Sequence, residues 1–226
     1  NTTAGSITDV YDLLAEATVH AVGEEVVKVE HCLIGLEAVP LKLLRKVLSH
    51  PQALAQCATF LATLPNARAE NYHDTALAVE KVRDDGDPAQ AAIASEEAAR
   101  RYGLPVLRRN VANQAENYTR FLVVAREPAV YDPVLMCKTS LVFAVPHQHG
   151  ALARCLAVFD DHRLNLTKLE SRPQPNQPWQ YRFYVDFEGN LNTPEVQHAL
   201  DVLRPLTGSL KVLGCYPARV GAIPQL

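Results

Sequence analysis

Residues 139–162 read TSLVFAVPHQHGALARCLAVFDDH, and they set a short apolar run directly before a longer segment of helical pattern. The run from Thr139 to Val145 predicts a strand, and the segment from Gly150 to His162 predicts a helix. The pattern that follows predicts, in order, a strand over 165–172, a strand over 181–187, a helix over 194–204 and a strand over 210–213. This βαββαβ order predicts a ferredoxin-like fold.

The part of the chain before residue 126 alternates helices and strands in another order. Pro51 suits the first position of a helix whose buried face would include Leu54, Cys57, Ala58 and Leu61. The predicted helices cover 6–17, begin at 51 and 75, and cover 95–103, and the predicted strands cover 27–33, 91–94, 106–107 and 121–125. Such alternation predicts an α/β sheet covered on both faces. Residues 126–133 carry two prolines and no periodicity, so we predict a linker between domains 1–127 and 136–217.

The composition is that of a globular protein, with 48% hydrophobic and 21% charged residues and a net charge of -3. No long run of one charge is present, which argues against a nucleic acid or a membrane surface as partner. The five cysteines are scattered without a Cys-x-x-Cys pair, so neither a zinc site nor a disulfide framework is predicted. With no apolar stretch near the ~20 residues of a membrane span and no signal peptide, we expect a cytoplasmic protein.

Polar residues stand where predicted strands give way to helices. Ligands of open α/β sheets bind at the carboxyl ends of strands, where helix N-termini present N–H groups to anions. The residues concerned are Thr2, Thr3, Ser49, His50, Thr75, Ser95, Thr119 and Arg120. Singly, most of them are better explained as helix caps, but Thr119-Arg120-Phe121 opens an apolar strand and caps no evident helix. Residue types alone therefore predict a small-anion-binding α/β domain without naming a reaction.

Short motifs along the whole chain identify a resemblance. NTTAGS (1–6), SHPQ (49–52) followed by Gln56-Cys57, AIAS (92–95) and NYTRF (117–121) resemble the successive signatures of prephenate dehydratases. GAL (150–152), ESRP (170–173) and KVLGCYP (211–217) resemble the ACT regulatory domain attached to these enzymes. The likeness is strongest to the bacterial bifunctional chorismate mutase–prephenate dehydratases. It implies periplasmic-binding-protein-like catalytic lobes followed by a ferredoxin-like ACT domain. It also implies that a first lobe, and in the bifunctional form a mutase domain, precede Asn1.

The resemblance implies the decarboxylating dehydration of prephenate to phenylpyruvate, in phenylalanine biosynthesis, with no metal or organic cofactor. It places Thr119 at the departing hydroxyl, within the Thr119-Arg120-Phe121 motif. Arg120 would pair with a carboxylate or point away into the structure, and His50 would act as a general acid or only cap its helix. The residues expected to bind substrate are Asn1, Thr2, Thr3, Ser49, Gln52, Thr75, Ser95 and Asn117.

The second domain is expected to bind L-phenylalanine as a feedback inhibitor at an ACT–ACT interface of a homodimer or higher oligomer. The effector residues implied are Gly150, Ala151, Leu152, Asn165, Glu170, Ser171, Arg172 and Pro173. A plainer interpretation is that Glu170 and Arg172 merely pair across the sheet. Two other functions stay open, namely a non-catalytic ligand sensor and a dehydratase of arogenate, the amino counterpart of prephenate.

Overall fold

The computed structural model describes residues 8–174 and 180–218, so the predicted site residues Asn1, Thr2 and Thr3 lie outside the described residues. The chain divides into two compact units. Val27–Thr119 form one unit, and Ser6–Val26 with Arg120–Leu226 form the other. The boundary between them therefore falls between Thr119 and Arg120, inside the motif that the sequence singled out. The prediction of domains 1–127 and 136–217 rests on sequence motifs and is a different division of the chain.

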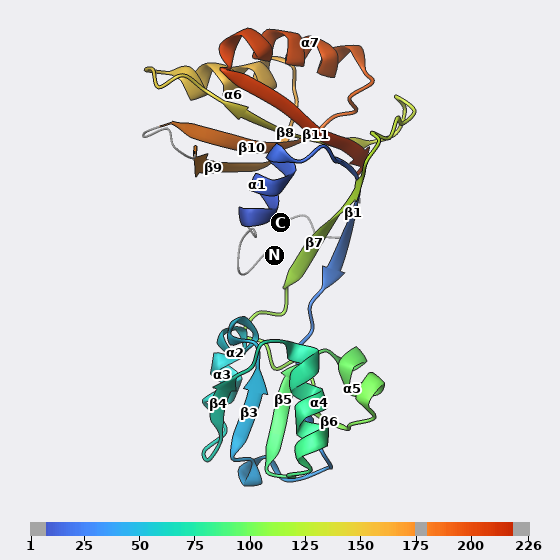
Figure 1. Cartoon of the computed structure of the whole chain (residues 1–226), viewed down its shortest axis with the longest axis vertical. Coiled ribbons are helices and arrows are strands. Elements are labelled where there is room, and N and C mark those ends of the chain that lie inside the picture. Colours follow the sequence, from blue (N-terminus) through green and yellow to red (C-terminus); the bar gives the residue numbers. More distant parts are fainter. Residues whose placement is uncertain (1–7, 175–179, 219–226) are drawn as a thin grey trace. The chain divides into compact units, whose positions relative to one another are not determined.

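The first unit is built on a five-stranded sheet of order β4-β3-β5-β2-β6 (Figure 1). Its strands are β2 (Cys32–Gly35), β3 (Lys46–Ser49), β4 (Arg68–Asn71), β5 (Gln90–Ala94) and β6 (Val106–Arg108). Strand β3 runs parallel to β4 and β5, whereas β2 is antiparallel to β5 and β6. Its helices are α2 (Pro51–Gln56), α3 (Ala58–Leu61), α4 (Thr75–Asp85) and α5 (Glu96–Tyr102), with a 3₁₀ turn at Leu41–Leu43.

Both faces of this sheet are covered, as predicted from the alternating pattern. Neighbouring residues of β3 divide between the faces, because side chains alternate along a strand. Leu48 packs with Val79 under α4 and α5, and Val47 packs with Leu54 under α2 and α3. The site residues at the ends of these strands are therefore held by two apolar layers.

Two local predictions for this part of the chain were wrong, and the strands β3 and β4 were not predicted. The strand expected over 27–33 is divided, since β1 (His20–Lys28) ends before β2 begins at Cys32. The single helix expected from Pro51 is broken at Cys57, whose N–H bonds the carbonyl of Leu54 three residues back, and Ala58 is exposed. Strand β4 was missed because all its residues are exposed, which leaves it without an alternating pattern.

The second unit contains a six-stranded sheet of order β7-β1-β11-β8-β10-β9. Its further elements are α1 (Thr8–Glu16), β7 (Tyr118–Ala125), β8 (Cys137–Ala144), α6 (Ala151–Asp161), β9 (Leu166–Pro173), β10 (Tyr181–Glu188), α7 (Pro194–Leu203), a 3₁₀ turn at Arg204–Leu206 and β11 (Ser209–Pro217). The run from β8 to β11 has the βαββαβ order predicted from residues 139–213. Strand β11 continues four residues beyond its predicted end at Leu213.

The sheet of the second unit is also covered on two faces. Phe143 packs with Phe159 and Leu200 in the core beneath α6 and α7. The neighbouring Val142 points to the other face, where it packs with Leu14 of α1. Strand β1 joins the sheet beside Gly214, where a Cβ atom would lie 2.0 Å from the carbonyl oxygen of Ala21. Only glycine allows the two backbones to approach so closely.

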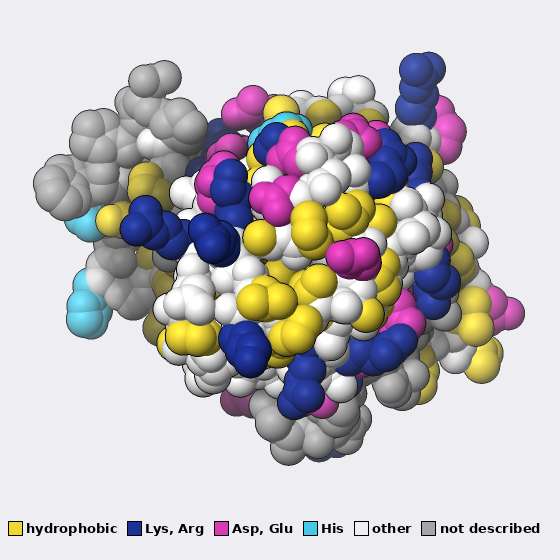
Figure 2. Space-filling view, turned by 90° about the horizontal axis from the view of Figure 1, so that it is seen from below, with side chains coloured by type: hydrophobic (Ala, Val, Ile, Leu, Met, Phe, Trp, Pro, Cys, Tyr) yellow, Lys and Arg dark blue, Asp and Glu magenta, His cyan; other side chains and the backbone are white. Residues whose placement is uncertain are grey.

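The surface carries both signs of charge. In the face shown in Figure 2, Lys and Arg side chains are interspersed with Asp and Glu and with apolar groups. Among the described residues, no helix is long and apolar enough to cross a membrane. In that same part of the chain, no three His, Cys, Asp or Glu side chains come together as a metal-binding group.

Candidate active site

Three predicted residues at the strand–helix junctions have local structural partners, whereas Thr75 is the first residue of α4 and the cap of that helix is Asp74. The buried Ser49 hydroxyl donates to the carbonyl of Ile93 at 2.5 Å. His50 caps α2, with its Nδ1 accepting from the N–H of Gln52 at 3.2 Å. Ser95 caps α5 by accepting from the N–H of Ala98 at 3.2 Å. The capping role expected for single residues is therefore present, and their role in binding a substrate stays a prediction.

A cavity of about 320 Å³ opens beside α2. Its walls come from α2 and from the segment that leads into β7, and five of the seven lining residues carry side-chain amides. The lining residues are Gln52, Ala55, Gln56, Ala112, Asn113, Gln114 and Asn117. Amides both donate and accept hydrogen bonds without bringing a charge, so this cavity suits a polar ligand with carboxylate or hydroxyl groups. Two predicted substrate residues, Gln52 and Asn117, thus meet in one cavity.

A buried histidine orients this wall. His31 is 6% exposed, and its Nε2 lies 2.9 Å from the Oε1 of Gln56. Asn117, which is 1% exposed, donates from its Nδ2 to the same oxygen at 3.4 Å. Because a carboxamide oxygen only accepts, His31 must carry its proton on Nε2. The three side chains fix which end of the Gln56 amide is turned toward its neighbours.

His31 was not among the predicted site residues, and Gln56 was noted only as part of a motif. In the sequence His31 follows the period-two alternation of an expected strand, which explains it as a packing residue. The one available signal was a titratable side chain at an apolar position. Its partner Gln56 is distant in sequence, so the contact itself could not be foreseen.

Thr119 and Phe121 lie on β7. Thr119 is half-buried and stands two residues after the cavity-lining Asn117, so its side chain is not enclosed in a packed core. The Asn117 carbonyl accepts from the N–H of Val29 at 2.7 Å, which holds the start of β7 against the end of β1. Phe121 is 55% exposed.

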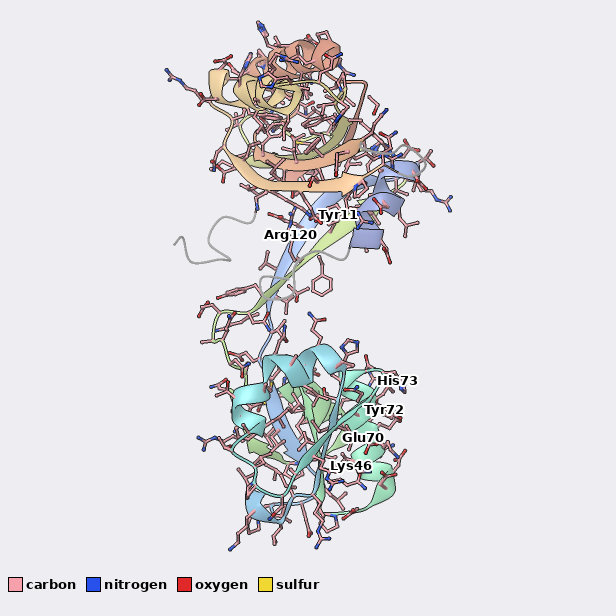
Figure 3. All side chains as sticks on the ribbon, turned by 90° about the vertical axis from the view of Figure 1, so that its left-hand side faces the viewer. Tyr11, Lys46, Glu70, Tyr72, His73 and Arg120 are labelled. Carbon is pink, nitrogen blue, oxygen red and sulfur yellow. The ribbon has the colours of Figure 1, made fainter. Side chains whose placement is uncertain are left out.

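Arg120, labelled in Figure 3, is held inside the second unit. Its guanidinium lies 2.7 Å from Glu24 and 2.5 Å from Asp186, and it donates to the hydroxyl of Tyr216. The Ser140 hydroxyl donates to Asp186 at 2.5 Å and lies 2.6 Å from the Tyr216 hydroxyl. Burial disfavours the charged form, but Tyr216, Asp186 and Glu24 outweigh it, and the pKa of Arg120 is raised. Arg120 was expected either to pair with a carboxylate of the substrate or to point away into the structure, and this geometry is the second of these.

The predicted effector segments lie on α6 and β9 of the second unit. Gly150 adopts φ 70° as the N-cap of α6, a left-handed conformation that favours glycine. Glu170 pairs with Lys168 at 3.0 Å, and Arg172 pairs with Asp12 at 2.5 Å. Lys168 is on the same strand as Glu170 and Asp12 is on α1, so these two ion pairs do not run across the sheet. The remaining predicted residues are the buried Ala151, the half-buried Leu152, and the exposed Asn165, Ser171 and Pro173.

Known proteins that are similar in sequence point to one family. The family described as prephenate dehydratase matches residues 1–129. The bifunctional chorismate mutase/prephenate dehydratase of Escherichia coli (strain K12) is 43% identical over 218 residues, which are 96% of this chain and 56% of that protein. The chain thus spans a little over half the length of this curated relative.

Solved structures show the same likeness. A prephenate dehydratase from Arthrobacter aurescens in complex with L-Phe superposes with a TM-score of 0.85 at 29% identity, covering 98% of this chain and 74% of that one. A protein described as a novel type of quorum quenching acylase reaches 0.86 at 36% identity, covering 97% and 80%. Because this family matches residues 1–129, which are more than half of the chain, the chain belongs to the prephenate dehydratase family.

Proposed function

We propose that this chain carries prephenate dehydratase activity, converting prephenate to phenylpyruvate, carbon dioxide and water. The observation that carries the proposal is the place of Thr119, half-buried and two residues beyond an amide-lined cavity of about 320 Å³ within a chain of this family. Residues 1–127 would form the catalytic part, with periplasmic-binding-protein-like lobes. We place the reaction in the cytoplasm.

The reaction needs the protein to bind prephenate and to supply one proton. In prephenate the bond between the ring and its carboxylate breaks, its electron pair enters the ring, and the hydroxyl leaves across the ring as water after gaining a proton. The barrier falls when a donor bonds the departing hydroxyl and the carboxylates are held in place. Thr119 would supply that donor, and the amides of Gln52, Gln56 and Asn117 would bond the carboxylates. In the neutral tautomer that accepts from Gln52, His50 carries its proton on Nε2, where a second donor would be available.

The proposal is tested by incubating the chain with prephenate and measuring phenylpyruvate. Arogenate is assayed in parallel, since the difference between the two substrates lies in one amino group. Amide hydrolysis is measured as well, because a related structure is described as an acylase. Turnover of prephenate supports the proposal. Binding of prephenate or phenylalanine without any turnover would instead favour the non-catalytic sensor.

The His31 contact predicts a measurable part of this activity. Replacing His31 with leucine removes a donor to the Oε1 of Gln56, so the amide loses part of its fixed orientation toward substrate. We expect kcat/KM to fall roughly tenfold, the equivalent of one hydrogen bond in transition-state binding. His147→Leu, an exposed histidine in the second unit, is the control and should behave as wild type. Equal kinetics of the His31 variant and wild type would contradict the role given to this histidine.

We also propose that residues 136–217 are a ferredoxin-like ACT regulatory domain that binds L-phenylalanine and lowers the activity. The βαββαβ order, the left-handed Gly150 at the start of α6 and the L-Phe complex of the Arthrobacter relative support this assignment. The site would lie between two copies of the chain in a homodimer or larger oligomer. Titration calorimetry with phenylalanine tests it, and absence of binding at millimolar concentration would contradict it.

A further inference from the structure

Helix α1 packs on the face of the second unit's sheet opposite to α6 and α7. Its Leu14 is 6% exposed and packs with Val142, Tyr184 and Leu213. Tyr11, labelled in Figure 3, meets the ring of Tyr184 edge-on at 5.5 Å between centroids. The apolar side of this helix is thus buried against the strands β8, β10 and β11.

Polar contacts hold the two ends of the same helix. The Nζ of Lys211 donates to the carbonyls of Leu14, Ala15 and Ala17 at 3.0, 2.9 and 2.7 Å. These carbonyls lack partners within a helix, and a cation at a helix C-terminus is favourable. Lys168 of β9 lies 3.3 Å from the centre of the Tyr11 ring. The helix is therefore attached to β9 and to β11.

Asp12 of α1 bonds Arg172, whose pKa is also raised by the charge of Asp9 on the same helix. Its Oδ2 accepts from Arg172 at 2.5 Å, and its Oδ1 accepts from the Tyr184 hydroxyl at 2.9 Å. The bond from Arg172 lowers the pKa of Asp12 despite partial burial. Both oxygens are thus engaged, one with β9 and one with β10.

These contacts join the proposed phenylalanine site to a helix outside it. Arg172 belongs to the ESRP segment of that site, whereas α1 carries none of the proposed site residues. A ligand that moves Arg172, or offers it a new anion, changes the free energy of the ion pair between Arg172 and Asp12. The stability of α1 on the sheet then changes as well.

Resting on the proposed function, we infer that Asp12 is a positioning residue that couples helix α1 to the phenylalanine site through Arg172. Phenylalanine bound at β9 alters the Asp12–Arg172 pair and, with it, the stability of α1 on the sheet. Because coupling is reciprocal, loss of the Asp12 carboxylate must weaken both the effect of phenylalanine on α1 and the effect of α1 on phenylalanine binding.

The test measures hydrogen exchange of the α1 amides with and without saturating phenylalanine, together with calorimetric binding. In the wild type, phenylalanine should change the exchange of α1 about fivefold, the lower end of typical allosteric couplings. In Asp12→Asn, which keeps the size of the side chain and removes its charge, phenylalanine should still bind but the change should fall below about twofold. Glu16→Gln is the matched control, since it removes a carboxylate of the same helix. That side chain is 66% exposed, and its ion pair with Arg182 is long, at 3.8 Å.

Tyr184→Phe separates coupling from mere loosening of the helix. It removes one hydrogen bond to Asp12 and keeps the ion pair, so its response should resemble the wild type. The inference is overturned if Tyr184→Phe and Glu16→Gln lose the response as Asp12→Asn does, or if Asp12→Asn shows the full response. It is also overturned if bound phenylalanine leaves the hydrogen exchange of α1 unchanged in the wild type. Failure of phenylalanine to bind contradicts the proposed regulation itself, and none of these readouts depends on catalytic turnover.

Discussion

Replacement of Thr119 with valine is expected to lower kcat about a hundredfold or more, because one properly placed donor to developing charge contributes on the order of 10²–10³ in rate. Valine keeps the branched shape of threonine and removes only the hydroxyl. Thr119 is half-buried on β7, so the change should leave the fold intact. KM should change little, because the hydroxyl acts on the departing group more than on the bound ground state.

The measurement is steady-state formation of phenylpyruvate, with thermal unfolding of each variant as the check on folding. Thr119→Ser restores a hydroxyl at the same position and should recover much of the rate. Thr59→Val makes the same chemical change at an exposed position of α3 and should be silent. If Thr119→Val turns over like the wild type, the departing hydroxyl is not bonded by Thr119 and the mechanism above is wrong.

Replacement of Arg120 with leucine is expected to destabilise the second unit by about 3–5 kcal/mol, the usual result of removing one partner from a buried ion pair. The side chain of Glu24 is 0% exposed and that of Asp186 is 4% exposed. Without the guanidinium, two buried carboxylates lose their main counter-charge. Lys138, at 2.9 Å from Glu24, compensates only one of them.

Denaturant unfolding of the Arg120→Leu variant measures this loss. Arg126→Leu, at an exposed arginine after β7, is the matched control and should stay near the wild-type free energy of unfolding. Arg120→Lys keeps the charge and should lose less than Arg120→Leu. A variant with wild-type stability but greatly reduced turnover would show instead that Arg120 acts on substrate, as the sequence motif first suggested.

Much of the secondary structure could be predicted from local patterns. The order from β8 to β11 follows from apolar periodicity, and the starts of α2, α4 and α5 follow from Pro51, Asp74 and Ser95, whose side chains or rings act within a few residues. The exposed strand β4 and the break at Cys57 were missed because neither leaves a periodic signal. The motifs that mark the family are likewise local, and they include Gln52 and Asn117, which line one cavity.

The sequence by itself determined the family, the βαββαβ order and the Thr119 motif, because each depends on residues near one another in the chain. Only the tertiary structure decided that His31 orients Gln56, that Arg120 is enclosed by Glu24, Asp186 and Tyr216, and that Asp12 reaches Arg172. The physical reason is that a buried polar group must find a partner wherever folding brings one within hydrogen-bonding distance. In this chain those partners come from strands and helices up to 160 residues apart, as Asp12 and Arg172 are.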